Sequence, residues 1–309
     1  MELSLFDLHC DTAYEMLKQK QPLADNSLAV SLKKAEGFRR YVQVMALWTD
    51  HRIGDEDGWL QYLAMRSNLL GDSALQTGAA RIVTRYPEAD EKSPTLFLAV
   101  EDARILAEKI ERVDLLYGHG VRILTPLWKG LTCIGGSHDT DTGLTDFGKR
   151  ALTRAAELGM ILDLSHASRA SANDMLEIAA CYSRPVVATH SDAYAVCPVS
   201  RNLRDEQVLA ILRTGGVIGL NLYGAFLKAD GNATAEDLIP HIEHFLSLGG
   251  EDALCLGCDM DGCDLPPDVP DLSALPRLAK LLQKRNYSDR LIQKLFFENA
   301  DRFAKQYLI

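Results

Sequence analysis

His9 and Asp11 form a His-x-Asp triplet directly after a short apolar run over residues 3–8. Residues i and i+2 share a face in an extended chain, so one imidazole nitrogen and one carboxylate oxygen can point to the same place. This combination of donors suits a borderline divalent cation such as zinc. A solvated or capping His-Asp pair is the ordinary alternative, and ligands from elsewhere in the chain are needed to decide.

Four further potential ligands each follow one of the later apolar runs. They are Glu101, His166, His190 and Asp259. Three carboxylates held about 4 Å apart repel by roughly 4 kcal/mol per pair at an effective dielectric near 20. Protons or cations must compensate that repulsion, and the accompanying histidines favour cations. The sequence therefore predicts a site for two metal ions, with Glu101 as the bridging carboxylate.

The elements that must position these residues are strands and helices in regular alternation. Apolar runs rich in Val, Ile and Leu cover residues 3–8, 42–47, 95–100, 121–125, 160–164, 185–189, 217–221 and 253–257, and segments of helical periodicity separate most of them. Eight strand-helix units predict an α/β fold of the (β/α)8 TIM-barrel type, in which functional groups come from the carboxyl ends of the strands. Because the eighth strand closes beside the first, the six potential ligands are expected to meet at one mouth.

We expect one domain over residues 1–309, because no Pro/Gly/Ser-rich linker or charge block divides the chain. Residues 50–94 are longer than one crossover requires and predict an insertion with an extra helix over residues 58–70. The last two predicted helices, at 272–285 and 288–306, would complete the wall of the barrel.

The formal net charge of −10 argues against a nucleic-acid partner. The N-terminus does not resemble a signal peptide and no apolar run is long enough to span a bilayer, which predicts a cytoplasmic protein without membrane contact. The seven cysteines are expected to be reduced and mostly buried. A small-molecule substrate is the expected partner, and a homodimer remains open.

Five segments of the chain resemble a known family in combination. They are residues 7–12, 143–148, 158–166, 189–194 and 200–203. They are similar to segments of the membrane (renal) dipeptidase family, peptidase family M19, whose members are metal-dependent barrels of the amidohydrolase superfamily. The resemblance implies a binuclear zinc metallopeptidase that hydrolyses dipeptides. Acceptance of a D-residue at the carboxyl end is left open.

The resemblance also implies a role for each ligand. His9 and Asp11 would bind one metal ion, and His166 and His190 would bind the second. Glu101 would bridge the two ions.

Further residues correspond to the family's catalytic and substrate-side groups. Asp259 corresponds to the acid that handles the proton of the activated water. Arg201 corresponds to the residue that binds the substrate's terminal carboxylate, and Tyr223 to a tyrosine on the substrate side.

The chain departs from the family pattern at two places. Trp128 stands where relatives often have a histidine that contacts the reacting carbonyl, and His138 in a nearby loop is either a substitute for it or an exposed loop residue. Asp102 and Ala103 follow Glu101 where relatives usually have glycines, which adds bulk near the pocket. Both departures concern the choice of substrate.

Two other functions remain open. One is a different amidohydrolase that acts on an acylated amino acid, a lactone or a cyclic amide. The other is a non-catalytic relative, for which Trp128 is the argument. A phosphate-binding barrel enzyme is disfavoured, because the glycine pairs at 215–216 and 249–250 precede their strands and lie at the wrong end of the barrel.

Overall fold

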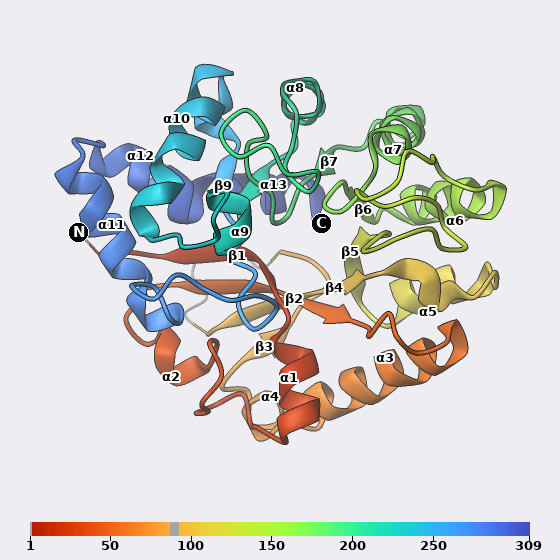
Figure 1. Cartoon of the computed structure of the whole chain (residues 1–309). Coiled ribbons are helices and arrows are strands. Elements are labelled where there is room, and N and C mark those ends of the chain that lie inside the picture. Colours follow the sequence, from red (N-terminus) through yellow and green to blue (C-terminus); the bar gives the residue numbers. More distant parts are fainter. Residues whose placement is uncertain (1, 87–92) are drawn as a thin grey trace.

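Strands lie at the centre of the molecule and helices surround them in the computed structural model, which describes residues 2–86 and 93–309 (Figure 1). The strands are β1 (Leu5–Cys10), β2 (Tyr41–Trp48), β3 (Arg81–Ile82), β4 (Thr95–Glu101), β5 (Val121–Thr125), β6 (Ile161–Asp163), β7 (Val186–Val187), β8 (Ile218–Leu220) and β9 (Leu254–Leu256). The helices are α1 (Thr12–Gln19), α2 (Leu32–Ala35), α3 (Asp55–Leu70), α4 (Ser73–Gln76), α5 (Glu111–Gly118), α6 (Asp146–Leu158), α7 (Arg169–Cys181), α8 (Asp205–Thr214), α9 (Gly224–Leu227), α10 (Ile239–Ser247), α11 (Leu275–Lys284), α12 (Asp289–Gln293) and α13 (Asn299–Tyr307). Short 3₁₀ turns occur at Ala103–Leu106, Ala235–Leu238, Gly250–Asp252 and Leu272–Ala274, and a π-helical turn at Lys294–Glu298 joins α12 to α13.

The strands form one parallel sheet in the order β7-β6-β5-β4-β2-β1-β9-β8. A parallel bridge between Ala188 and Ile218 connects the end of β7 to β8, so the sheet closes on itself. The predicted TIM barrel is therefore confirmed, and each of the eight predicted apolar runs overlaps one barrel strand. The additional strand β3 was not predicted, and it pairs with the first two residues of β4.

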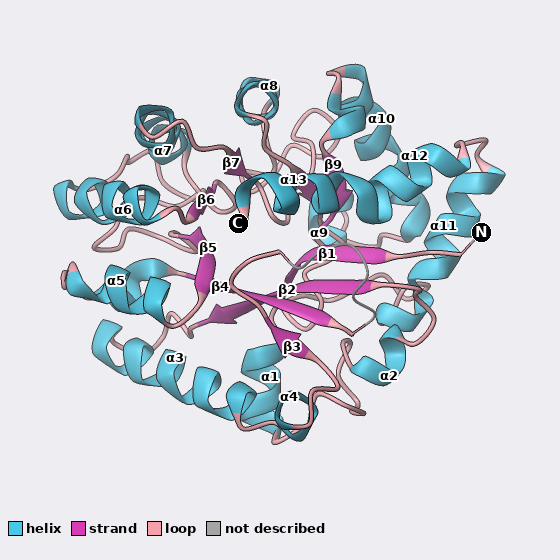
Figure 2. Cartoon of the chain, turned by 180° about the vertical axis from the view of Figure 1, so that it is seen from behind, coloured by secondary structure: helices cyan, strands magenta, loops and turns pink. Residues whose placement is uncertain are grey.

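The interior of the barrel is apolar at its amino-terminal end. Its core cluster combines side chains from seven of the eight barrel strands, from Val217 directly before β8 and from the last helix, and includes Phe6, Val44, Phe97, Ile123, Val187 and Phe303. Side chains two residues apart in a strand share this interior face. Helix α13 crosses this end of the barrel (Figure 2) and thereby leaves the opposite, carboxyl-terminal mouth for function.

In β1 the alternation of side chains between the barrel interior and the outer face is broken next to the predicted ligand His9. Phe6 and Leu8 belong to the interior cluster, whereas Cys10 belongs to the outer one. The pairing register of β1 with β2 shifts between Asp7 and Cys10. Such an irregularity re-aims the following side chains, and here it turns His9 toward the barrel axis.

The predicted insertion at residues 50–94 contains α3, α4 and β3. Helix α3 begins at Asp55, three residues before the predicted start, because acidic residues in its first turn suit the positive end of the helix dipole. Residues 87–92 of this insertion lie outside the described part of the chain. Among the described residues, no helix is both long and apolar enough to cross a lipid bilayer.

Candidate metal centre

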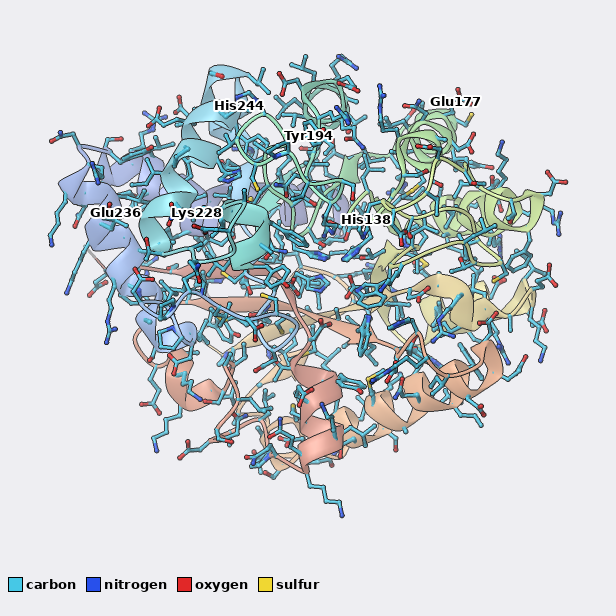
Figure 3. All side chains as sticks on the ribbon, in the orientation of Figure 1. His138, Glu177, Tyr194, Lys228, Glu236 and His244 are labelled. Carbon is cyan, nitrogen blue, oxygen red and sulfur yellow. The ribbon has the colours of Figure 1, made fainter. Side chains whose placement is uncertain are left out.

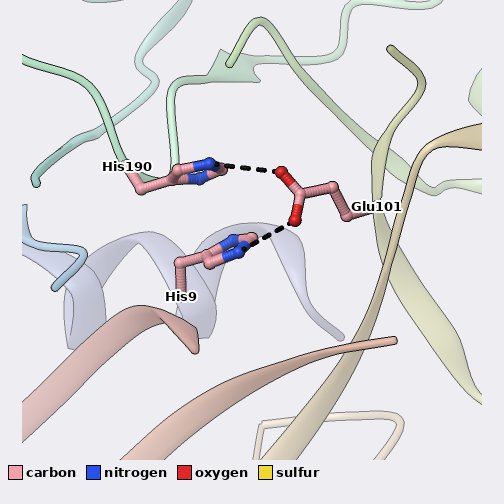
Figure 4. Close-up of side chains that lie close together, drawn as sticks. All are labelled: His9, Glu101 and His190. Atoms are coloured by element: carbon pink, nitrogen blue, oxygen red, sulfur yellow. Dashed lines mark ion pairs between the residues drawn. The ribbon is translucent and has the colours of Figure 1, made fainter. Parts of the chain in front are cut away.

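Glu101, the last residue of β4, lies at the centre of the predicted ligands and is 1% exposed. Its Oε2 atom lies 3.3 Å from His9 Nε2. Its Oε1 atom lies 3.0 Å from His166 Nε2 and 3.3 Å from His190 Nε2. The two oxygens thus face different histidines, as the close-up of His9, Glu101 and His190 shows (Figure 4).

The two aspartates complete the cluster on the side of His9. Asp11 Oδ1 lies 3.7 Å from His9 Nε2, and Asp259 Oδ1 lies 3.9 Å from the same nitrogen. Ligand atoms of His9, Glu101 and His190 lie within 4.8 Å of one another, as do those of His9, Asp11 and Asp259. The structure therefore brings together all six residues that the sequence singled out.

Hydrogen bonds at the far side of two rings fix which nitrogen faces the cluster. His166 Nδ1 lies 3.0 Å from the carbonyl oxygen of Trp128, which can only accept, so this nitrogen carries the hydrogen. His190 Nδ1 lies 2.8 Å from Thr189 Oγ1. With both Nδ1 atoms engaged, the Nε2 lone pairs of His166 and His190 point to the same space, 3.1 Å apart.

Several buried polar atoms of the cluster have no hydrogen-bond partner among the described residues. They are His9 Nε2, Asp11 Oδ1 and Glu101 Oε1. Buried polar atoms are nearly always satisfied, so this concentration of unsatisfied acceptors needs an explanation. Imidazole nitrogens mixed with carboxylate oxygens are the donor set of zinc and similar divalent cations. The residues therefore fit the metal ions that the sequence predicts.

The pKa shifts describe the same cluster without cations. Burial raises the pKa of Glu101 to about 8, although His9 opposes the shift. The pKa of His9 is raised well above its ordinary value, because nearby Glu101 and Asp11 outweigh its burial. Burial lowers the pKa of both His166 and His190. Both raised pKa values favour the protonated forms of Glu101 and His9, which offsets part of the negative charge of the cluster.

Three residues near the cluster adopt left-handed backbone conformations that non-glycine residues rarely occupy. The φ angles are 71° at Asp102, 65° at His166 and 59° at Asp259. Each residue follows the end of a barrel strand, where the chain must turn sharply to aim side chains at the axis. Such conformations concentrate at functional sites, since surrounding contacts must hold them in place.

Gly262 is required at the edge of the cluster for a steric reason. A Cβ atom there would overlap Asp11 Oδ2 and approach Asp259 Oδ1 to 2.5 Å. Only glycine lets the chain pass so close to both carboxylates.

A cavity of about 440 Å³ opens above the cluster. Its lining includes Asp11, Glu101, Trp128, His166, Tyr223, Phe226, Asp259, Cys263 and Asp264. Trp128 packs against Trp48 with ring centroids 5.3 Å apart, and Tyr223 packs against Phe226 at 4.8 Å. A volume of this size suits a small molecule. The predicted substrate-side residues Trp128 and Tyr223 thus line the cavity.

Arg201 is 4% exposed and lies beside the cluster. Its Nη1 donates to Ser191 Oγ and its Nη2 to the carbonyl oxygen of His190, both at 2.7 Å. Its guanidinium carbon lies 5.4 Å from the centre of the Phe226 ring. No carboxylate in the described ranges forms an ion pair with it, so a buried positive charge is available to an anionic ligand.

His138 borders a second cavity of about 130 Å³ and not the larger one. Figure 3 labels His138 among the side chains near the centre of the molecule. Its Nδ1 lies 2.9 Å from Ser200 Oγ, and its ring centroid is 5.8 Å from that of His166. Burial, assisted by the charge of Arg201, lowers the pKa of His138 to about 4. The ring is therefore neutral at physiological pH, and its contact with a substrate stays a prediction.

Three polar residues beneath the cluster were not assigned a functional role from the sequence. Thr125, Asp163 and Thr189 each stand two residues after an interior apolar side chain, and all three are at most 1% exposed. The signal in the sequence was their spacing, which continues the interior face of β5, β6 and β7.

The family model for membrane dipeptidases, peptidase family M19, matches residues 1–307. The chain belongs to the membrane dipeptidase family. This chain superposes with a TM-score of 0.90 on the crystal structure of the metallopeptidase dipeptidase AC of family M19, with 27% sequence identity and coverage of 100% of this chain and 99% of that one. The TM-score is also 0.90 against a Rhodobacter sphaeroides metallopeptidase bound to a phosphinate mimic of the dipeptide L-Ala-D-Ala, with 26% identity and coverage of 99% and 100%.

Two curated relatives are similar in sequence to this chain. An uncharacterised protein from the pqqA 5′ region of Klebsiella pneumoniae is 37% identical over 205 residues, which are 62% of this chain and 74% of the relative. A Schizosaccharomyces pombe protein described as an uncharacterised dipeptidase is 31% identical over 220 residues, which are 68% of this chain and 52% of the relative.

Proposed function

We propose that this member of the dipeptidase family is a binuclear, zinc-dependent enzyme that hydrolyses the peptide bond of dipeptides, including those with a C-terminal D-residue. The observation that carries the proposal is the position of Glu101. One of its oxygens faces His9 at 3.3 Å and the other faces His166 at 3.0 Å and His190 at 3.3 Å. A carboxylate shared in this way is suited to bridge two ions.

In this proposal His9 and Asp11 hold one ion, and His166 and His190 hold the other. The unsatisfied acceptors of the cluster and its mixture of nitrogen and oxygen donors support the assignment. Bound divalent ions supply polarisation of the substrate carbonyl and a lowered pKa of water.

Asp259 is the proposed proton carrier. Its Oδ2 accepts a hydrogen bond from Asn221 Nδ2 at 3.1 Å, while its Oδ1 faces the cluster. Burial raises the pKa of Asp259 to about 6, although His9 opposes the shift. A carboxylate with a pKa near neutrality can accept a proton from the attacking water and pass it to the leaving amine.

Arg201 is the proposed anchor of the substrate's carboxylate. Its guanidinium is buried and its charge is not paired with a carboxylate of the described residues, so an anionic ligand would compensate it. Arg201 borders the second cavity together with His138, and its guanidinium faces the ring of Phe226, which lines the main cavity. The dipeptide mimic bound to the Rhodobacter sphaeroides metallopeptidase supports a substrate of this size and a D-residue at its carboxyl end.

Trp128 lines the cavity with its indole, and its carbonyl oxygen binds His166. An indole cannot polarise a carbonyl as a histidine would. We therefore assign its side chain to contact with the substrate's apolar part, and leave His138 as the candidate for a polar contact at the border with the second cavity.

The decisive experiment measures bound metal and activity on one panel of compounds. The purified protein is expected to contain two zinc ions per chain and to cleave L-Ala-D-Ala and L-Ala-L-Ala but not N-acetylated amino acids, lactones or cyclic amides. Cleavage of one of the latter classes alone would favour a different amidohydrolase. Two bound ions without any hydrolysis would indicate a non-catalytic relative.

A further inference from the structure

Asp163, the last residue of β6, is fully buried inside the barrel, beneath the cluster of predicted metal ligands. Its Oδ1 accepts hydrogen bonds from the main-chain N–H groups of Ser165 and Thr189, both at 2.9 Å. Its Oδ2 accepts hydrogen bonds from Thr125 Oγ1 at 2.6 Å and from Thr189 Oγ1. These four donors match the four lone-pair positions of the carboxylate.

The hydroxyl of Thr189 consequently has a fixed direction. Its single hydrogen points to Asp163, so toward other groups the oxygen can only accept. Two ring nitrogens face this oxygen: His190 Nδ1 at 2.8 Å and His9 Nδ1 at 3.4 Å. Each neutral ring must then carry its hydrogen on Nδ1 and present the lone pair of Nε2 to Glu101.

We propose that Thr189, oriented by Asp163, is a positioning residue that sets the tautomer of His190 and His9 and so presents one ligand to each of the two metal ions. The inference rests on the binuclear site of the proposed function. It adds a second set of residues behind the ligands, in which the carboxylate of Asp163 orients the hydroxyl of Thr189. That one hydroxyl then contacts both His190 and His9, which are the proposed ligands of different ions.

The backbone around Thr189 is held on two sides, which makes it a precise support. A Cβ atom on Gly219 or Gly257 would overlap the carbonyl oxygen of Thr189, so β8 and β9 approach it as closely as glycine allows. On the other side its N–H is bound by Asp163. The branched side chain of threonine further restricts the direction of the hydroxyl.

The same hydroxyl also limits how His9 and His190 can move. Their ring centroids lie only 3.7 Å apart with planes inclined by 34°. A ring that rotated away from Thr189 would lose its hydrogen bond, leave a buried nitrogen unsatisfied and withdraw its Nε2 from Glu101.

Thr125 provides a matched control, because it donates to the same Asp163 oxygen without a hydrogen bond to either histidine. Zinc affinity of the full chain is measured by competition with a chromogenic chelator. Outer hydrogen bonds of this kind typically contribute about 10- to 100-fold in metal affinity. We expect Thr189→Val to weaken zinc binding by that factor, Thr189→Ser to restore it, and Thr125→Val to stay within about threefold of the parent protein.

Asp163→Asn is a second, nearly isosteric test. The amide oxygen must face the two main-chain N–H groups, so the NH₂ group donates to Thr189 Oγ1, whose hydrogen then turns to His190 Nδ1. His190 would carry its hydrogen on Nε2 and lose its lone pair toward the site. Long-range ¹⁵N-¹H spectra of the histidine-labelled, metal-stripped chain read this tautomer directly.

Weak zinc binding in Thr189→Val and Asp163→Asn, with the thermal midpoint of the metal-stripped chain close to that of Thr125→Val, supports the proposal. Unchanged zinc affinity in both variants, or an equal loss in Thr125→Val, overturns it. If Thr189→Val does not fold, the zinc affinity of Thr189→Ser and the zinc affinity and His190 tautomer of Asp163→Asn still test the proposal. Neither readout uses a dipeptide, so failure of the proposed catalytic function would be seen separately.

Discussion

Arg104 Nε donates a hydrogen bond to Asp102 Oδ2 at 3.0 Å, directly beside Glu101, the proposed bridging residue. Asp102 adopts a φ of 71°, where glycine is the usual residue. Its carboxylate also accepts the N–H of Arg104 and caps the 3₁₀ turn that follows. Arg104 further donates to the carbonyl oxygens of Asp50 and Ile53, which ties the loop after β2 to the end of β4.

The pair is buried, with side-chain exposures of 6% for Arg104 and 1% for Asp102. Removal of one partner of a buried pair typically costs about 3–5 kcal/mol, because the other charge is left uncompensated. We expect Arg104→Ala to lower the free energy of unfolding by about this amount in urea titrations, and Asp102→Gly in the same chain to recover part of it.

Arg169→Ala is the matched control for Arg104, because Arg169 and its partner Glu206 are both exposed, with side-chain exposures of 68% and 57%. An exposed pair is worth at most about 1 kcal/mol. Equal losses in the two variants would contradict a special role for the buried pair.

The raised pKa of Glu101 predicts how the free energy of unfolding of the metal-free protein depends on pH. Burial raises its pKa from the ordinary 4.5 to about 8. Between these values the folded chain holds a proton that the unfolded chain has released, so the free energy of unfolding falls as pH rises. His9, with a raised pKa, acts in the same direction, whereas His166 and His190 oppose it only below their ordinary value of 6.5.

We therefore expect the urea midpoint of the chelator-treated protein to decrease from pH 6.5 to pH 8. One proton accounts for at most about 1.4 kcal/mol per pH unit. Glu101→Gln should flatten the dependence, and saturating zinc should remove it because the ligands then hold ions in place of protons. A midpoint that rises over this interval would show that other groups dominate.

The barrel was predictable because the alternation of apolar runs and helical segments repeats eight times. The barrel fold predicts the order of the strands, and this order predicts that Glu101 lies near His9 and His190. The prediction needed only that all ligands stand at carboxyl ends of strands, which is a property of the sequence once the fold is known.

The support beneath the ligands was not predictable from residue types. The shift of register in β1 that aims His9 inward has no sequence signature. Thr189 and Thr125 look like ordinary strand residues, and their link to Asp163 exists only when β5, β6 and β7 are side by side. Likewise, the carbonyl oxygen of Trp128 that orients His166 is present in every residue type.

Arg201→Ala is expected to raise KM for dipeptides by about 10- to 150-fold, because a hydrogen bond to a charged group is worth about 1.5–3 kcal/mol. Two metal ions should remain bound. Arg201→Lys should restore only part of the loss, since lysine lacks the forked geometry. Arg150→Ala is the control, because Arg150 is exposed, lies over the ring of Phe147 at 5.9 Å and lines neither of the two cavities. An unchanged KM in Arg201→Ala would remove the proposed carboxylate contact.

Asp259→Asn is expected to lower kcat by about 10²- to 10⁴-fold, which is the usual contribution of general acid-base catalysis. The amide keeps the size of the side chain and can still accept from Asn221, so metal content should not change. Asp264→Asn tests charge alone, because Asp264 is an exposed acid on the rim of the same cavity. A similar kcat in the two variants would exclude Asp259 as the proton carrier.

Trp128→Ala separates the two contributions of this residue. Its carbonyl oxygen remains available to His166 whatever the side chain, so zinc affinity should stay within about threefold of the parent protein. The indole, in contrast, lines the cavity and packs against Trp48. Loss of an apolar contact in a binding pocket costs about 1–3 kcal/mol, so kcat/KM for dipeptides with large apolar side chains should fall by about 10- to 200-fold.

Cleavage of Gly-D-Ala should change far less in Trp128→Ala, because a glycine offers no side chain for the indole to contact. Trp59→Ala is the control, since Trp59 stacks on Tyr62 at 5.2 Å within α3 and does not line the cavity. The measurement is the ratio of kcat/KM for L-Leu-D-Ala to that for Gly-D-Ala in each variant. If the ratio is the same in all three proteins, the indole does not select substrates, and the difference from the family histidine must act on the chemical step.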